Sequence, residues 1–207
     1  AVAGLIIAWF GTAVSFYLAG LGSLTMVAVI YGLRIPRTLR EVRATPAQDL
    51  LDGLNFIRKN PLFSFLIGMT FFNSFFGLAY ITLMPVFAVD ILKVGAEGQG
   101  LLMSVGGVGA LLATVWLSSR GSTEHKGLLI IGGAVTFGLS LIAFALTSEY
   151  IGSYTLAVVL MFAMGLFNSA YNISLQSSLQ LLVPDSMRGR VMGFYTMTYS
   201  ISPLGAM

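Results

Sequence analysis

The chain has 207 residues, of which 57% are hydrophobic and only 9% are charged, with a formal net charge of +3. Soluble domains carry about 25% charged residues, and the mean hydropathy here is +0.89, so the composition excludes that class and indicates an integral membrane protein. Apolar runs of roughly twenty residues favour helices over a β-barrel, whose strands alternate over about ten residues.

The apolar runs predict membrane helices along the whole chain. In order, the expected segments are 1–10, 13–33, 61–92, 98–119, 127–147, 150–183 and a last helix that starts near Arg188. Gly11 and Thr12 should separate the first two, and Pro85 should bend the 61–92 helix near its far end. Because the chain starts and stops inside apolar runs, we interpret it as part of a longer protein.

The charged residues all fall in the connections or at the ends of the apolar segments, which gives a topology. Successive connections must alternate between the two sides of the membrane. The connections 34–60, 119–126 and 183–190 share one side and carry ten of the eleven Lys and Arg residues, while the other side carries only Lys93. By the positive-inside rule, the ten-residue side faces the cytoplasm. The sequence therefore predicts a multi-pass protein of the cell's inner (plasma) membrane.

The polar segment 34–60 separates two groups of helices and has a pattern of its own. Thr45 to Gln48 reads as a capping box with proline at the first helical position. An apolar stripe follows, with acidic residues elsewhere on the helix; the stripe consists of Leu50, Leu51, Leu54 and Ile57. This pattern predicts an amphipathic helix on the inner membrane surface. A solvated linker is the alternative, and both interpretations make the segment a boundary.

The polar residues in the middle of the apolar segments are uncharged, and four amide side chains of segment 150–183 lie on one face. Asn168, Asn172, Gln176 and Gln180 recur every four residues, which places them on the same side of a helix. Because amides in hydrocarbon need partners, this face must meet a cavity or another helix. It either binds substrate or holds helices together by hydrogen bonds worth roughly 0.6–2 kcal/mol each.

A second polar face belongs to the segment that begins at Pro61. Asn73, near its middle, and Tyr80 are the candidates for substrate binding there. Four phenylalanines surround Asn73, namely Phe71, Phe72, Phe75 and Phe76. An aromatic wall beside an amide suits a bulky, largely apolar ligand, although phenylalanines in membrane helices also face lipid or neighbouring helices.

The sequence contains no motif for catalysis, for cofactor or metal binding, or for nucleic-acid binding. There are no cysteines, no Walker or HExxH motif and no Ser-His-Asp grouping, so we expect no enzyme activity, no cofactor, no metal and no nucleic-acid partner. The lone histidine, His125, lies in a charged turn and reads as a solvated loop residue. No ionisable side chain falls within the middle of a predicted span, so a proton-relay carboxylate is expected outside this chain.

The stretch "LLVPDSMRGRVMGF" (181–194) reads as a turn between two membrane helices. Pro184 should end the first helix, and Asp185 and Ser186 can cap the second. Arg188 follows Asp185 by three residues, close enough to pair with it on the first helical turn. A patch of small residues at 106–113 is expected to allow close helix packing.

Several stretches resemble the Major Facilitator Superfamily. Residues 61–92, "PLFSFLIGMTFFNSFFGLAYITLMPVFAVDIL", and the following "GLLMSVGGVGALLATVWLSSR" resemble helices seven and eight of its bacterial exporter branch, which includes enterobactin exporters and macrolide efflux proteins. "NISLQSSLQLLVPDSMRGRVMGFYTMTYSISPLGAM" resembles helices ten and eleven, and "AVAGLIIAWFG" resembles the end of helix five. Within the loop "SSRGSTEHKG", Arg120 and Gly121 match the family's Gly–Asp–Arg–Gly–Arg signature, but its aspartate is absent.

The resemblance implies an all-α fragment of a twelve-helix fold with two six-helix bundles. Residues 1–33 would end the N-terminal bundle, 34–60 would form the central linker, and 61–207 would begin the C-terminal bundle. The implied function is secondary active transport by alternating access, here export of small amphipathic molecules such as drugs or siderophores, as an antiporter coupled to protons or sodium, by a monomer in the lipid bilayer.

The resemblance also distributes roles among residues. Asn73, Tyr80, Asn168, Asn172 and Gln176 would bind substrate. A cytoplasmic gate would use a second set, Arg120, Asp185, Arg188 and Arg190. The alternative is a transporter-like membrane protein with a sensing or assembly role, which the missing loop aspartate and the absence of mid-span charge keep open.

Overall fold

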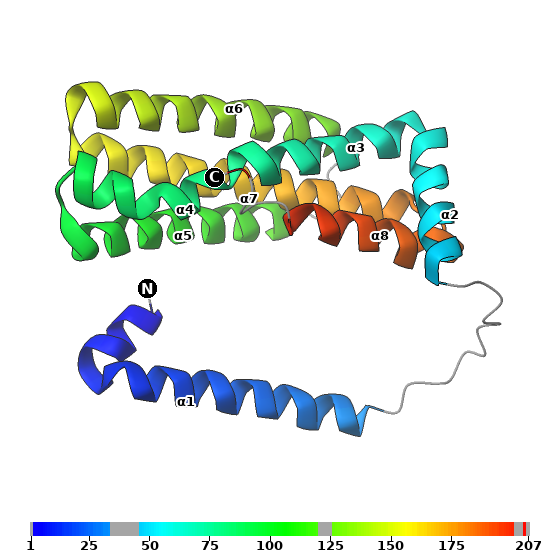
Figure 1. Cartoon of the computed structure of the whole chain (residues 1–207), viewed down its shortest axis with the longest axis horizontal. Helices are drawn as coiled ribbons and strands as arrows, with labels where there is room; N and C mark the ends of the chain where they lie inside the picture. Colours follow the sequence, from blue (N-terminus) through cyan, green and yellow to red (C-terminus); the bar gives the residue numbers. More distant parts are fainter. Residues whose placement is uncertain (1, 34–45, 120–125, 201–204, 206–207) are drawn as a thin grey trace. The chain divides into compact units, whose positions relative to one another are not determined.

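The computed structural model describes residues 2–33, 46–119, 126–200 and 205, and every regular element among them is helical. Two compact units result, residues 1–43 and residues 44–207. The first contains α1, Val2–Gly32. This helix continues through Gly11 and Thr12, so the predicted break there is wrong, although its ribbon changes direction in its N-terminal part (Figure 1). A glycine weakens a helix by only about 1 kcal/mol, which an apolar helix in a membrane can tolerate.

The second unit is a bundle of helices. Its elements are α2 Pro46–Lys59, α3 Pro61–Phe72, η1 Asn73–Gly77, α4 Ala79–Val86, η2 Phe87–Ile91, α5 Gly95–Ser119, α6 Lys126–Leu146, η3 Thr147–Ile151, α7 Tyr154–Leu182 and α8 Asp185–Tyr199, where η denotes a π-helical segment. Among the described residues, four helical runs are long and apolar enough to cross a membrane: Pro61–Ile91, Gly95–Ser119, Lys126–Ile151 and Tyr154–Leu182. The all-helical membrane fold predicted from the sequence is confirmed.

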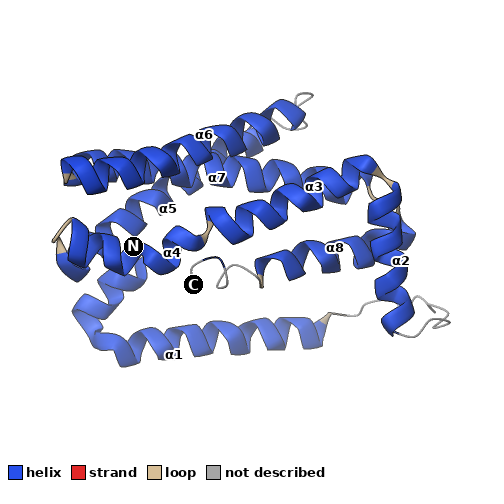
Figure 2. Cartoon of the chain, turned by 45° about the horizontal axis from the view of Figure 1, so that its top comes forward, coloured by secondary structure: helices blue, strands red, loops and turns tan. Residues whose placement is uncertain are grey.

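Two boundaries differ from the sequence prediction. The helix that starts at Pro61 is interrupted at Leu78, between η1 and α4 (Figure 2), whereas Pro85 lies inside α4. The helix after Lys126 runs on to Ile151, and α7 starts only at Tyr154. Gly152 makes this second turn, because its φ of +63° is a left-handed conformation that glycine adopts without strain.

Helix α7 is the centre of the second unit, with α5 and α6 packed along it (Figure 1). Glycines permit this packing. A Cβ atom at Gly165 would collide with the backbone of Gly106 on α5, and one at Gly109 would collide with the carbonyl of Phe162 on α7. The small-residue patch therefore brings helix backbones together, as the sequence predicted.

The apolar core of the second unit forms two clusters. One, near α2 and α8, includes Phe63, Leu175 and Val191. The other, near the α4–α5 and α6–α7 connections, includes Met84, Leu102 and Phe144. Along α7, Tyr171 belongs to the first cluster and Phe167 packs against the second, so Asn168 lies where the two clusters adjoin.

Candidate functional site

Asn73 occupies an irregular point of its helix. It is the first residue of η1, and its carbonyl oxygen accepts a hydrogen bond from the N–H of Leu78, five residues later, at 2.9 Å. Such π-helical turns are frequent at functional sites because they displace side chains from the regular helical register. Gly77 makes room for the amide: a Cβ atom there would lie 2.5 Å from the Asn73 Oδ1 and 2.9 Å from the Phe137 ring.

Four side chains from three helical segments form a continuous hydrogen-bonded group, which we call the polar cluster: Asn73, Asn168, Asn172 and Tyr199. The Nδ2 of Asn168 donates to the Oδ1 of Asn73 at 3.2 Å. The Nδ2 of Asn172 donates to both the side-chain and the backbone oxygen of Asn168, each at 2.9 Å. The Tyr199 hydroxyl donates to the Oδ1 of Asn172 at 2.8 Å and lies 2.9 Å from the Tyr195 hydroxyl.

The polar cluster keeps one unused donor. The Nδ2 of Asn73 is buried and has no hydrogen-bond partner among the described residues. A buried amide donor without a partner costs about 1–3 kcal/mol, so an acceptor that reached it would be stabilised there. The four side chains are half-buried, and the cluster carries no charge. It can therefore orient a neutral hydrogen-bonding group, but it does not supply an ion for charge recognition.

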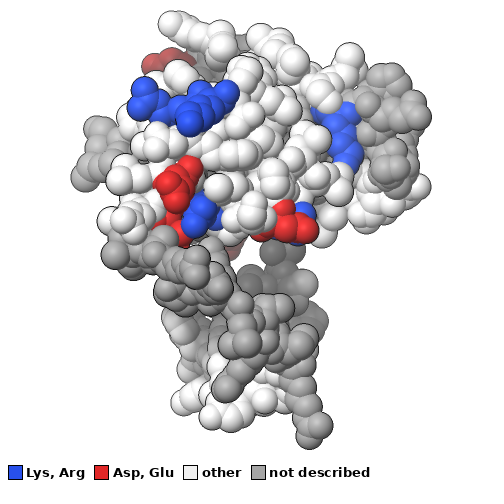
Figure 3. Space-filling view, turned by 90° about the vertical axis from the view of Figure 1, so that its right-hand side faces the viewer, with Lys and Arg blue, Asp and Glu red and all other residues white. Residues whose placement is uncertain are grey.

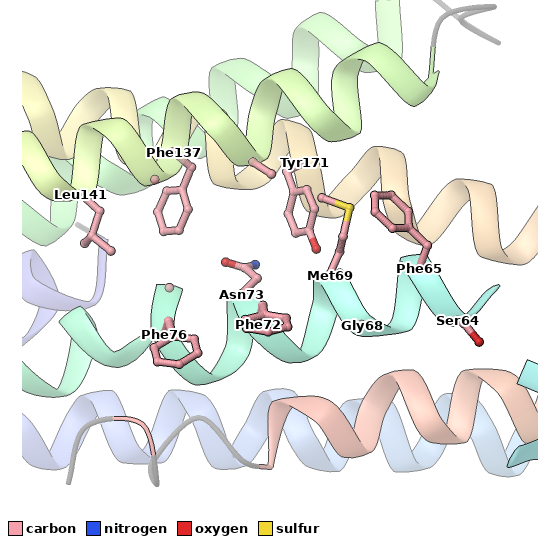
Figure 4. A pocket seen from close by; sticks show the side chains of 13 residues that line it. Ser64, Phe65, Gly68, Met69, Phe72, Asn73, Phe76, Phe137, Leu141 and Tyr171 are labelled. Atoms are coloured by element: carbon pink, nitrogen blue, oxygen red, sulfur yellow. The ribbon is translucent and has the colours of Figure 1, made fainter. Parts of the chain in front are cut away.

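A hollow of about 600 Å³ adjoins Asn73 between α3, α6 and α7. In Figure 4, the side chains of Asn73, Phe137 and Tyr171 point into this space. Aromatic and aliphatic side chains form most of its lining, including Phe65, Phe72, Phe76, Met69 and Leu141. The rings of Phe72 and Phe76 stack at 5.8 Å. Phe71 and Phe75 stack on each other at 6.0 Å and do not line the hollow.

Two other predicted substrate contacts lie apart from the polar cluster. Tyr80 packs against the Phe137 ring, with 6.3 Å between the ring centroids, beside the core cluster that contains Met84. Gln176 is exposed one turn beyond Asn172 on α7. The structure therefore joins three of the five predicted contacts and leaves these two outside the hydrogen-bonded group.

One end of the second unit carries most of its described basic residues, and we call it the basic end. Five residues gather there: Arg58, Lys59, Lys126, Arg188 and Arg190. Figure 3 views this end and shows basic and acidic side chains side by side. Arg188 pairs with Asp185 at 2.7 Å, as its spacing predicted. Arg120 lies outside the described residues.

Arg190 makes a connection that the sequence did not reveal. Its Nε donates to the Oδ1 of Asp49 at 2.9 Å, its NH2 group contacts the same oxygen, and its NH1 lies 3.8 Å from Asp52. Residue 53, one turn after Asp49 on α2, is a glycine, and a Cβ atom there would be 3.0 Å from the Arg190 Cβ and 3.1 Å from the Phe194 ring. These contacts attach α2 to α8.

The predicted apolar stripe of α2 divides between two environments. Ile57 is buried in the core, whereas Leu50, Leu51 and Leu54 remain exposed. Asp49 and Asp52, which lie elsewhere on the helix, contact Arg190. Pro46 begins the helix as predicted, while Thr45 of the expected capping box lies outside the described residues.

The predicted cap of α8 is also wrong. Pro184 occupies the N-cap position, and no side chain makes a capping hydrogen bond there. Asp185 and Ser186 instead lie in the first turn, where the Asp185 carboxylate still interacts favourably with the helix dipole.

Sequence reasoning missed Tyr199, Asp49 and Asp52. Tyr195 and Tyr199 do have the four-residue spacing that singled out the asparagines, so they could have been recognised as one face. No comparable signal relates Asp49 to Arg190, which are 141 residues apart. Within the described ranges, no three His, Cys, Asp or Glu side chains gather to hold a metal ion.

A helical bundle with four membrane-length apolar runs and an uncharged mid-span cluster defines a multi-pass integral membrane protein. The sequence model of the Major Facilitator Superfamily matches residues 1–207, and the chain belongs to this family. It is accordingly part of a membrane transporter for small molecules. No curated protein and no solved structure matches the chain.

Proposed function

We propose that this transporter exports small amphipathic molecules across the bacterial inner membrane by alternating access. The observation that carries the proposal is the polar cluster, which combines mid-span position, half-buried side chains and an unused donor at Asn73. Transporters of this fold bind substrate near the bilayer midplane. A mid-span group with spare hydrogen-bonding capacity is the feature that such binding requires.

The chemistry of the surroundings favours a largely apolar substrate with at least one hydrogen-bond acceptor. The acceptor would reach the Nδ2 of Asn73, while Asn168 and Asn172 hold that amide in position. Aromatic rings next to Asn73 would contact the apolar part of the molecule. Tyr80 and Gln176 are proposed as outer contacts on either side of the polar cluster.

We propose that the basic end acts as the cytoplasmic gate. Arg190 would hold α2 on α8 through Asp49 and Asp52 in one state and release it in another. Arg188 and Asp185 would support the same turn, and Arg120 is a further candidate. Because these ion pairs are partly exposed, water can replace them at modest cost, which a reversible gate requires.

Coupling to protons or sodium is part of the proposal, with the protein acting as a monomeric antiporter. Among the described residues, no carboxylate lies in the middle of a membrane-length run; Asp90, Glu97 and Glu149 lie near the ends of theirs. A buried proton-relay carboxylate would therefore be contributed by residues other than the described mid-span ones.

The full-length protein, expressed in efflux-deficient cells, provides the test. It should lower the accumulation of some labelled drugs or siderophores, and Asn172→Leu should restore accumulation while the protein still reaches the membrane. Gln180→Leu on the same helix is the control, because Gln180 is exposed near the basic end. Unchanged accumulation across a broad panel would contradict export and favour a sensing or assembly role.

A further inference from the structure

A small polar pocket lies at the basic end, where α5 ends and α6 begins. Its volume is about 170 Å³, and its polar lining consists of Lys126, Ser118, Ser174 and Ser177. The Nζ of Lys126 donates to the Oγ of Ser177 at 3.2 Å. Ser174 is 2% exposed, and its Oγ has no hydrogen-bond partner among the described residues. The described residues thus give the pocket one ammonium group, three hydroxyls and no carboxylate.

An apolar groove of about 620 Å³ adjoins this pocket between α5 and α6, and Leu129 lines both. The sides of the groove come from α5 and α6, and α7 contributes Leu166, Phe167 and Ala170. Trp116, in the last turn of α5, lines the groove and is 43% exposed. Tryptophan at this depth is typical of the membrane interface, where its ring meets lipid headgroups.

We propose that the polar pocket and this groove together bind one anionic phospholipid of the bilayer. The phosphate would accept hydrogen bonds from Lys126, Ser174 and Ser177, and acyl chains would lie along the α5–α6 groove. Basic pockets between membrane helices on the cytoplasmic side bind anionic lipid headgroups. The buried free hydroxyl of Ser174 is the independent sign of a ligand, because such a group normally has a partner.

The charge balance favours an anionic lipid over a zwitterionic one. Lys126 neutralises a single phosphate, and the described residues of the lining offer no carboxylate that could pair with the ammonium group of an ethanolamine or choline headgroup. None of the residues of the polar cluster lines the pocket or the groove. The proposal is therefore independent of the substrate assigned above.

Lipid retention by the purified, detergent-solubilised protein tests the proposal. Native mass spectrometry with added phosphatidylglycerol or phosphatidylcholine should show preferential retention of phosphatidylglycerol. Lys126→Gln should reduce that retention about fivefold, since one basic residue contributes about 1 kcal/mol to binding of an anionic surface. Ser174→Ala should also reduce retention without lowering the Tm of the lipid-free protein, because it removes a hydroxyl that has no partner there.

Two glycines on α6 supply a matched pair for the groove. Gly132 lines it, Gly138 lines a different hollow, and a Cβ atom at either position meets nothing within 4 Å. Gly132→Leu should fill the groove and lower phosphatidylglycerol retention, whereas Gly138→Leu should not. Lys93→Gln, which removes the described basic residue at the opposite end, should likewise leave retention unchanged.

Three results would overturn the proposal. The first is equal retention of phosphatidylglycerol and phosphatidylcholine. The second is equal loss of retention in the Gly132→Leu and Gly138→Leu variants. The third is thermal stabilisation by inorganic phosphate or glycerol phosphate as large as that by the lipid, which would identify a site for a free anion.

Discussion

The polar cluster and the basic end both connect helices, but they do so in two different dielectric environments. At mid-span, Asn73, Asn168, Asn172 and Tyr199 connect helices through neutral hydrogen bonds. At the basic end, Arg190 connects α8 to α2 through carboxylates. A charged side chain has a much higher free energy in hydrocarbon than in water. Neutral amide and hydroxyl groups therefore connect the helices at mid-span, and charged groups connect them at the basic end.

The difference predicts how each region responds to the loss of one partner. An amide left unpaired at mid-span has no water to replace its partner. A carboxylate left unpaired at the basic end is hydrated, because the side chains of Asp49 and Asp52 are 37% and 54% exposed. Substitutions in the polar cluster should therefore affect stability more than substitutions of the ion pairs.

The largest effect is expected from Asn168→Leu. This change removes the donor to Asn73 and the acceptor of Asn172, and it should lower the free energy of unfolding by roughly 1–3 kcal/mol. Thermal unfolding in detergent measures it. Gln176→Leu also replaces a side-chain amide with leucine, but at an exposed position of α7, and it should shift the Tm little. Equal Tm values for the two variants would show that the cluster does not stabilise the bundle.

A steric change at the basic end should have a somewhat smaller effect. Gly53→Leu keeps all charges but places side-chain atoms against Arg190 and Phe194, where a Cβ already lies at 3.0 and 3.1 Å. The overpacking should cost about 1–2 kcal/mol, and α2 should separate from α8. Hydrogen exchange of residues 46–59 would rise; unchanged protection of that helix would contradict the packing of α2 seen here.

The parts of these regions that sequence could predict are the local ones. The four-residue spacing of Asn168 and Asn172 placed them on one face, and they share a hydrogen bond. The three-residue spacing of Asp185 and Arg188 predicted their ion pair. Apolar runs that are long enough, as helices, to cross the hydrocarbon core predicted the membrane spans. In each case, helical geometry alone determines the neighbours.

The contacts that could not be predicted join residues far apart in the chain. Asn73 and Asn168 are separated by 95 residues, and Asp49 and Arg190 by 141. Such pairs depend on how distant helices pack against each other, which no local pattern in the sequence specifies. The interruption at Leu78 was missed for a related reason: the π-helical turn at Asn73 has no proline to signal it.

Removing the charge of Arg190 should have a smaller effect than displacing α2 sterically. Arg190→Gln keeps much of the side-chain volume but loses the ion pairs with Asp49 and Asp52, at a cost of about 1 kcal/mol or less in low salt. Limited proteolysis near α2 should accelerate, and raising the salt concentration should accelerate it in the wild type too. Proteolysis that is as slow in Arg190→Gln as in the wild type would mean that apolar contacts such as those of Ile57 hold α2 by themselves.

The smallest effect is expected for the Asp185–Arg188 pair, which is the more exposed of the two sets of ion pairs at the basic end. Its side chains are 87% and 49% exposed, against 19% for Arg190, so water screens their attraction almost completely. A double-mutant cycle of Asp185→Asn and Arg188→Gln should give a coupling energy of about 0.3–0.5 kcal/mol in low salt. At about 1 M salt, where the screening length is about 3 Å, the coupling should vanish. A coupling above that range which persists in high salt would show that this exposed turn is shielded from water in the membrane-embedded protein.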